Sequence, residues 1–139
     1  MDFETMRHLV EEALPFHKLL GIKTEELREG YARLRIPFRP ELVGDARRPA
    51  LHGGVISTLA DVCGGFAIWT CCRPDDRIAT IDLGVDYLRP AGAVDLLAEA
   101  TVRLLGNRVG NAHVVLWSQD APDRHVAEAR AVYNIRRGK

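Results

Sequence analysis

Asp61 is the residue whose sequence surroundings most favour chemistry. It is the only charged residue in the otherwise apolar stretch Gly53–Cys72. Burying an unpaired carboxylate costs free energy, because desolvation disfavours the charged form and raises the pKa. Proteins retain such a group where it has hydrogen-bond partners or a catalytic task. Asp61 is therefore a candidate nucleophile or general base, and a loop cap or an interface contact is the structural alternative.

The residues His52, Gly53 and Gly54 precede this stretch and could supply hydrogen-bond donors to a ligand. Two glycines let the backbone approach a ligand closely. The first amides of a helix have no partner within the helix and lie at the positive end of its dipole. Such amides suit a carbonyl oxygen that becomes negative in a transition state. The same glycines could instead only let a loop enter the helix, and His52 could be a packing residue.

The composition is that of an ordinary globular protein. Of the 139 residues, 47% are hydrophobic and 27% are charged. This length accommodates one hydrophobic core, so we predict a single domain over residues 1–139. The 19 basic residues balance 19 acidic residues. The chain as a whole therefore has no electrostatic reason to bind nucleic acid or an anionic membrane, and we predict neither as a partner.

The cysteines and the N-terminus predict a cytoplasmic location. Cys63, Cys71 and Cys72 have a spacing that suits neither a disulfide framework nor a zinc site, so we predict no bound metal. Cys63 is expected to pack in the core as a small apolar side chain. Residues 1–7 lack the basic segment and the long apolar core of a secretion signal.

Residues 53–72 have a length that could cross a membrane, but their composition argues against insertion. They include four glycines, three hydroxyl residues and Asp61. A carboxylate at the centre of a bilayer costs about 2.5–3.5 kcal/mol. We therefore predict no membrane-spanning segment.

Hydrophobic periodicity predicts a short helix and a hairpin at the start of the chain. Residues 3–14 have apolar side chains at helical spacing, and Pro15 ends the pattern. Leu19–Arg28 and Tyr31–Pro37 are predicted as the two strands of the hairpin. Residues 38–52 follow neither period and are predicted as a loop.

A helix is predicted over Gly54–Thr70, where the sequence is apolar on every face, and such a helix must be surrounded by protein. The connections between the strands that follow are short and rich in turn residues, so we expect consecutive strands to pair antiparallel. The fold class is therefore α+β, with a curved antiparallel sheet of about six strands around one central helix of about residues 54–70, plus a short N-terminal helix. Unpaired edge strands of such a sheet favour oligomerisation. The later strands are predicted at Ile78–Arg89, Val94–Leu105, Val109–Gln119 and His125–Arg136.

Two segments resemble motifs of a known enzyme family. The run Leu51–Asp61, LHGGVISTLAD, resembles the motif of hotdog-fold thioesterases of the phenylacetate-degradation (PaaI-like) type. The run Thr80–Ala91, TIDLGVDYLRPA, is similar to the central-strand motif of that family. The resemblance covers essentially the whole chain. It implies the hotdog fold and the hydrolysis of an acyl-CoA or aryl-CoA thioester to a free acid and CoA.

The resemblance also implies roles for the candidate catalytic residues. Asp61 would attack the thioester carbonyl or activate water. The amide of Gly53 would polarise the thioester oxygen, His52 would help to shape the site, and the run Leu51–Gly54 would carry its acyl-binding end. Thr80 occupies the position of a hydroxyl residue that can place the water.

The chain departs from the family pattern at one position. The family often has an asparagine where this chain has Ala46. The polar contact of that asparagine is therefore missing, or is replaced by Asp45 or Arg47.

Coenzyme A carries phosphates, so cations are expected along the rim of the site. Candidates from the sequence are Arg47, Arg48, Arg89 and Arg108, although each could be a solvated surface charge. The resemblance implies that the nucleotide part of CoA lies at the turn Gly106–Gly110. It also implies that no metal or organic cofactor takes part, since CoA is part of the substrate. With Gly54 and Arg89, the predicted substrate-binding residues are Asn107, Arg108, Val109 and Gly110.

In the family the site lies between two subunits, which implies that Gly53 and Asp61 of one chain belong to different active sites. A homodimer is then the minimum, and many relatives are dimers of dimers. Two other functions stay open from the sequence, namely a hotdog dehydratase or hydratase and a non-catalytic acyl-CoA-binding module. Aryl, medium-chain and short branched acyl groups are all compatible with the residues.

Overall fold

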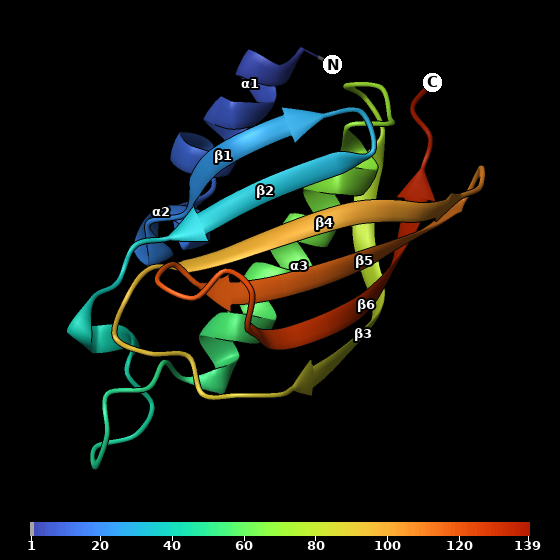
Figure 1. The fold of residues 1–139 in the computed structure, drawn as a ribbon. Coiled ribbons are helices and arrows are strands. Elements are labelled where there is room, and N and C mark those ends of the chain that lie inside the picture. Colours follow the sequence, from blue (N-terminus) through green and yellow to red (C-terminus); the bar gives the residue numbers. More distant parts are fainter. Residues whose placement is uncertain (1) are drawn as a thin grey trace.

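Helix α3 (Gly53–Trp69) lies at the centre of the structure, and a six-stranded antiparallel sheet curves around it (Figure 1). The computed structural model describes residues 2–139, and Met1, the first residue of the predicted domain, lies outside the described residues. The strand order is β1-β2-β4-β5-β6-β3. This arrangement confirms the predicted curved sheet, central helix and N-terminal helix. The strands are β1 (Lys23–Arg28), β2 (Tyr31–Ile36), β3 (Arg77–Tyr87), β4 (Leu96–Leu105), β5 (Val109–Ser118) and β6 (His125–Arg136).

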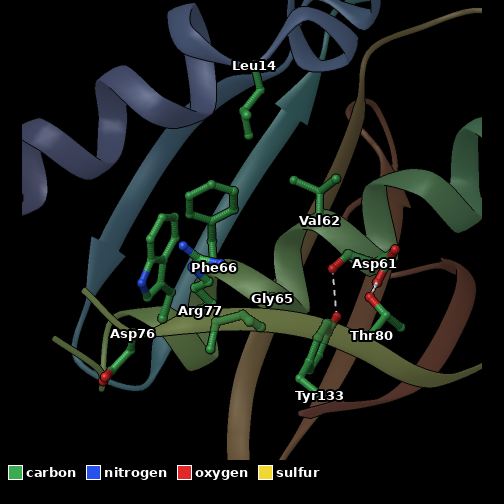
Figure 2. Close-up of a pocket in the computed structure, with 11 residues that line it drawn as sticks. Leu14, Asp61, Val62, Gly65, Phe66, Asp76, Arg77, Thr80 and Tyr133 are labelled. Atoms are coloured by element: carbon green, nitrogen blue, oxygen red, sulfur yellow. Dashed lines mark hydrogen bonds between the residues drawn. The ribbon is translucent and has the colours of Figure 1, made fainter. Parts of the chain in front are cut away.

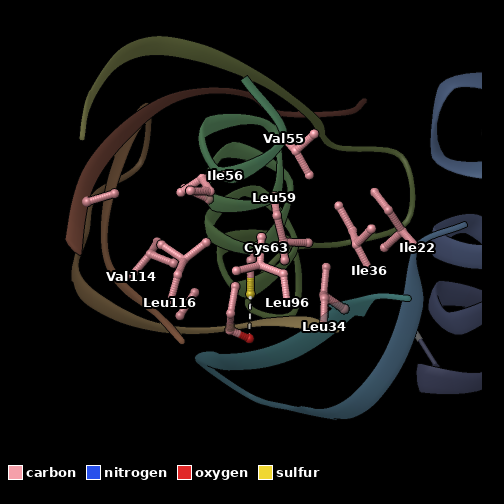
Figure 3. Close-up of a cluster of buried hydrophobic side chains, with 14 of the residues drawn as sticks. Ile22, Leu34, Ile36, Val55, Ile56, Leu59, Cys63, Leu96, Val114 and Leu116 are labelled. Carbon is pink, nitrogen blue, oxygen red and sulfur yellow. Dashed lines mark hydrogen bonds between the residues drawn. The ribbon is translucent and has the colours of Figure 1, made fainter. Parts of the chain in front are cut away.

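The core forms between α3 and the concave face of the sheet (Figure 3). Leu59 and Cys63 point from the helix into this core and are fully buried. Burial raises the pKa of the Cys63 thiol, which donates a hydrogen bond to the Ala32 carbonyl at 3.3 Å. Its predicted role as a core residue is confirmed. Because many inward positions of the sheet are alanine, the strands can approach the helix closely; these alanines are residues 32, 98, 100, 112, 127, 129 and 131.

The N-terminal segment contains one more helix than predicted. α1 (Phe3–His8) continues into a π-helical turn, η1 (Leu9–Ala13), and α2 (Pro15–Leu20) follows. Pro15 was predicted only to end a helix, but it also begins the next one, since proline is well tolerated in the first turn. Gly21 ends α2 with a φ of 72°.

Two boundaries in the first half of the chain differ from the prediction. The strand predicted over Leu19–Arg28 starts only at Lys23, because Leu19 and Leu20 belong to α2. The predicted loop 38–52 contains a short 3-10 helix, η2 (Pro40–Leu42).

The two edges of the sheet differ in how their backbone groups are satisfied. At the β1 edge, the Thr24 N–H donates to the Glu11 carboxylate at 2.8 Å, and the Thr24 carbonyl accepts from Arg7 at 3.1 Å. The N-terminal helices therefore cover this edge. Strand β3 forms the other edge and pairs only with β6. Exposed apolar side chains lie along it, including Ile81, which is 57% exposed.

The position of β3 corrects one prediction. Consecutive strands β4, β5 and β6 pair antiparallel as expected, but β3 pairs with β6 and not with β4. The connection after β3 does not form a hairpin because it is held against the loop that precedes α3. The Ala91 carbonyl accepts from the Leu51 N–H at 2.9 Å, and Ala91 is buried. Within residues 2–139, no helix is both long enough and apolar enough to cross a membrane.

Candidate active site

Asp61 lies halfway along α3, on the one side of the helix that the sheet leaves partly open. The Thr80 hydroxyl of β3 donates a hydrogen bond to the Asp61 carboxylate at 2.7 Å (Figure 2). The prediction that α3 is enclosed on every face, with Asp61 buried, is wrong for the single chain. Asp61 is only half-buried, because β3 is an edge strand and no further strand continues the sheet beyond it.

Tyr133 of β6 holds the backbone of the same residue from the protein interior. Its hydroxyl donates to the carbonyl oxygen of Asp61 at 2.6 Å (Figure 2). The side chain is 1% exposed, and burial raises the pKa of the Tyr133 phenol well above its usual value. The phenol therefore stays protonated and remains a donor. Sequence reasoning missed Tyr133, although the Gly64-Gly65 pair in α3 could have indicated a large side chain packed against the helix.

Replacing Gly64 by alanine tests how closely Tyr133 packs on α3. A Cβ at Gly64 would lie 2.5 Å from the Tyr133 hydroxyl oxygen. We expect Gly64→Ala to lower the free energy of unfolding by about 1–3 kcal/mol, although alanine is the better helix former. In a Tyr133→Phe background, the nearest remaining ring atoms lie 3.3 Å away, so the same substitution should cost less. Chemical denaturation measures both differences, and equal costs in the two backgrounds would contradict this packing.

An apolar cavity of about 470 Å³ opens beside the Asp61 carboxylate. Its wall follows α3 from Asp61 through Val62 and Phe66 to Trp69. Leu14 of the N-terminal segment also lines it (Figure 2). Trp69 is eight positions after Asp61, which corresponds to about 12 Å along the helix axis. The cavity can therefore hold an apolar group that extends away from the carboxylate.

A second cavity, of about 480 Å³, lies at the start of α3. His52 caps the helix there, and its Nδ1 accepts a hydrogen bond from the Gly54 N–H at 2.8 Å. This contact places the proton of the neutral imidazole on Nε2. The Gly54 amide is thus occupied, whereas the Gly53 N–H has no acceptor among residues 2–139. Gly53 is therefore the residue at this helix start with a free donor.

The two cavities are separate within one chain. No residue lines both of them. Gly53 and Asp61 are eight residues apart on α3, about 12 Å along the axis. One reacting carbonyl group cannot contact the Gly53 amide and the Asp61 carboxylate of the same chain at once.

Two of the four arginines predicted to meet phosphates, Arg48 and Arg89, line the cavity at the start of α3. Arg47 and Arg48 pair with Asp45 at 3.7 Å and 3.5 Å. Asp45 also lines the cavity around His52. It therefore supplies a polar group next to Ala46, the position where the family often has asparagine. Arg89 lines the same cavity and donates to the His125 carbonyl at 2.7 Å.

The predicted nucleotide turn lies elsewhere on the chain. Asn107 and Arg108 line a third cavity of about 390 Å³ together with Arg136. Val109 is exposed. Gly110 is buried, and a Cβ there would lie 2.8 Å from Ile68, so Gly110 serves helix packing rather than an open surface.

A buried carboxylate fixes this turn to the C-terminal segment. Asp76 is 2% exposed and accepts hydrogen bonds from the Arg73 and Gly138 amides, both at 2.8 Å, and from the Arg137 guanidinium at 3.1 Å. These donors hold the pKa of Asp76 at about 2. Arg137 also donates to the Asn107 carbonyl at 2.8 Å. The turn is therefore held in place by contacts that the sequence pattern did not indicate.

Comparison with known proteins connects this geometry to a family. The family model described as Thioesterase superfamily matches residues 49–124. The medium/long-chain acyl-CoA thioesterase YigI of Salmonella typhimurium is 33% identical over 135 residues, which cover 88% of this chain and 86% of YigI. Among solved structures, a Shewanella oneidensis protein related to the thioesterase superfamily is 29% identical, with a TM-score of 0.81 over 94% of this chain and 93% of that one.

The PaaI protein from the phenylacetic acid degradation operon of Escherichia coli is also similar in structure. It is 25% identical, with a TM-score of 0.81 over 92% of this chain and 88% of PaaI. This similarity agrees with the resemblance of the Leu51–Asp61 and Thr80–Ala91 motifs. The chain therefore belongs to the thioesterase superfamily and has its hotdog fold.

Proposed function

We propose that the protein is an acyl-CoA thioesterase that hydrolyses a thioester with an apolar acyl or aryl group. The observation that carries the proposal is the half-exposed Asp61 carboxylate, held by Thr80 at the mouth of the apolar cavity. Membership of the thioesterase superfamily and the similarity to YigI support it. The acyl group would lie along Val62, Phe66 and Trp69, and not at Leu51–Gly54.

The chemistry follows from two groups of the site, the Asp61 carboxylate and the Gly53 N–H. Asp61 would attack the carbonyl carbon directly or take a proton from a water that attacks it. In the first route the carbon–sulfur bond breaks as an anhydride forms between the acyl group and Asp61, the CoA thiolate leaves and takes a proton from water, and a second water hydrolyses the anhydride to the free acid and the Asp61 carboxylate. In the second route the oxygen of the water adds to the carbonyl carbon, the carbon–sulfur bond breaks, and the proton held by Asp61 passes to the leaving sulfur, which gives the free acid and CoA. The Gly53 N–H would stabilise the negative carbonyl oxygen. The Thr80 hydroxyl would orient the carboxylate or the water, and no step needs a metal or an organic cofactor.

The proposed site requires two chains. Since Gly53 and Asp61 of one chain are too far apart for one thioester, the Gly53 amide would come from one subunit and the Asp61 carboxylate from its partner. The open β3 edge supports a homodimer in which two β3 strands pair. Such pairing would place the Thr80–Ala91 motif in the middle of a joint sheet, as its resemblance to a central-strand motif implies. A dimer of dimers is compatible with this arrangement.

The CoA moiety would bind along cationic and polar groups near these cavities. Arg48 and Arg89 both line the cavity of Gly53 and would meet a phosphate there. Asn107 and Arg108 would contact the nucleotide from the third cavity, with Val109 beside them. All three cysteines are free thiols, which supports a reducing compartment, and we place the reaction in the cytoplasm.

A thiol-release assay tests the proposed function. Purified protein is incubated with aryl-CoA, medium-chain and short branched acyl-CoA esters, and free CoA is measured with a thiol reagent. We expect turnover of at least one ester with an apolar acyl group. Saturable binding of these esters without release of CoA would instead identify an acyl-CoA-binding module, and would overturn the proposal.

A further inference from the structure

One peptide unit at the start of α3 is held by side chains on both of its sides. The N–H of the Gly53–Gly54 peptide belongs to Gly54 and donates to His52 Nδ1 at 2.8 Å. The carbonyl of the same peptide belongs to Gly53 and accepts from the Tyr87 hydroxyl at 3.2 Å. His52 precedes the helix directly, whereas Tyr87 is the last residue of β3. The plane of this peptide is therefore fixed from two elements of the fold.

A glycine at this position needs such a restraint. Glycine rotates about φ more freely than any other residue. The free Gly53 N–H belongs to the preceding peptide, which shares the Gly53 Cα with the clamped one. The carbonyl of that preceding peptide, on His52, accepts from the Val55 N–H at 3.0 Å. Both peptides that meet at the Gly53 Cα are therefore held, and together they fix the direction of the Gly53 N–H. A donor that is fixed before the reaction stabilises a developing negative charge better than a mobile donor.

Tyr87 is placed to act at this point rather than in the core. Its ring lies against Gly53, where a Cβ would be 3.4 Å from the Tyr87 Cε1 atom. The side chain is 54% exposed and lines the cavity that contains His52 and Gly53. Packing against Gly53 needs only the ring of Tyr87. The hydroxyl adds a hydrogen bond to the Gly53 carbonyl, next to the free amide.

We propose that Tyr87 is a positioning residue that, together with His52, clamps the Gly53–Gly54 peptide and so orients the free Gly53 amide toward the substrate carbonyl. The proposal rests on the proposed thioesterase function, and it assigns a role to a residue outside the two catalytic groups. Tyr87→Phe removes the hydroxyl and keeps the ring against Gly53. We expect kcat to fall about tenfold, as for the loss of one well-placed hydrogen bond, with little change in KM or Tm.

A spectroscopic measurement separates orientation of the amide from general damage. The probe is the ketone analogue of decanoyl-CoA in which a methylene replaces the thioester sulfur, so that it binds but cannot be hydrolysed. In the wild-type protein, hydrogen bonding to the Gly53 N–H should lower the carbonyl stretching frequency of the bound analogue. In Tyr87→Phe the frequency should shift back toward its value in water.

Tyr31→Phe is the matched control, since Tyr31 bonds to Glu99 at the opposite end of β2 from the loop that leads to α3. It should leave both kcat and the carbonyl frequency unchanged. An active wild-type enzyme whose Tyr87→Phe variant keeps the same kcat and frequency would overturn the clamp, as would a loss of Tm alone. If the wild-type protein releases no CoA from any ester, the proposed function fails instead. The frequency difference between the two proteins then still decides whether Tyr87 orients the amide.

Discussion

Asp61→Asn should lower kcat for acyl-CoA hydrolysis by at least about 100-fold, as expected for the loss of a nucleophile or general base. The amide has nearly the same size as the carboxylate. Its oxygen can still accept the 2.7 Å hydrogen bond from Thr80, and the Tyr133 contact is to the backbone. The fold should therefore be unchanged while the reacting group is lost. Steady-state kinetics and thermal unfolding of the same preparation measure the two effects.

A second aspartate provides the control for this variant. Asp123 is exposed in the connection between β5 and β6, away from both cavities. Asp123→Asn makes the same change in charge and should keep wild-type kcat. An Asp61→Asn variant with near-wild-type turnover would show that Asp61 is not the reacting group, and its contact with Thr80 would then be structural.

Gly53→Pro should lower kcat by about 100–1,000-fold, the usual effect of removing one donor to a developing oxyanion. Proline deletes the backbone N–H, which at Gly53 bonds to no residue in the described chain. The position tolerates proline because it is the first residue of α3. The preceding residue, His52, has φ −61° and ψ 138°, the extended conformation that a residue before proline prefers. Catalysis should therefore be affected far more than Tm.

Gly53→Ala separates loss of the donor from added bulk. Alanine keeps the N–H, and its Cβ would be in ordinary contact with the Tyr87 ring at 3.4 Å. This variant should retain most of the wild-type turnover. If alanine and proline reduced kcat equally, bulk near Tyr87 and not the missing amide hydrogen would be responsible. A parallel loss of Tm in the proline variant would indicate a structural role for Gly53.

The parts of the fold that the sequence predicted well are those set by local pattern. The helix expected over Gly54–Thr70 is found at Gly53–Trp69, because a long apolar run without a strand period has few other solutions. The hairpin of β1 and β2 and the strand His125–Arg136 also follow from alternation and turn residues. The helix beginning at Pro15 was missed because proline was interpreted only as a helix breaker.

The remaining features depend on contacts between distant parts of the chain. β3 pairs with β6 and not with β4, and the connection that follows β3 is anchored at Ala91 on Leu51, 40 residues earlier in the sequence. Tyr133 reaches the Asp61 backbone across 72 residues, and Tyr87 reaches Gly53 across 34. The sequence around each tyrosine contains no local pattern that indicates which residue the tyrosine contacts. The motifs could therefore indicate the candidate reacting groups but not the side chains that hold them.

The most direct test of the composite site combines the two inactive variants in one dimer. Asp61→Asn and Gly53→Pro chains are co-expressed with different affinity tags, and dimers that carry both tags are purified. If the Gly53 amide and the Asp61 carboxylate of different subunits serve one thioester, one of the two sites in each mixed dimer is intact. Thiol release should then recover to about half of the wild-type rate per dimer. A mixed dimer as inactive as its two parents would contradict a site shared between subunits.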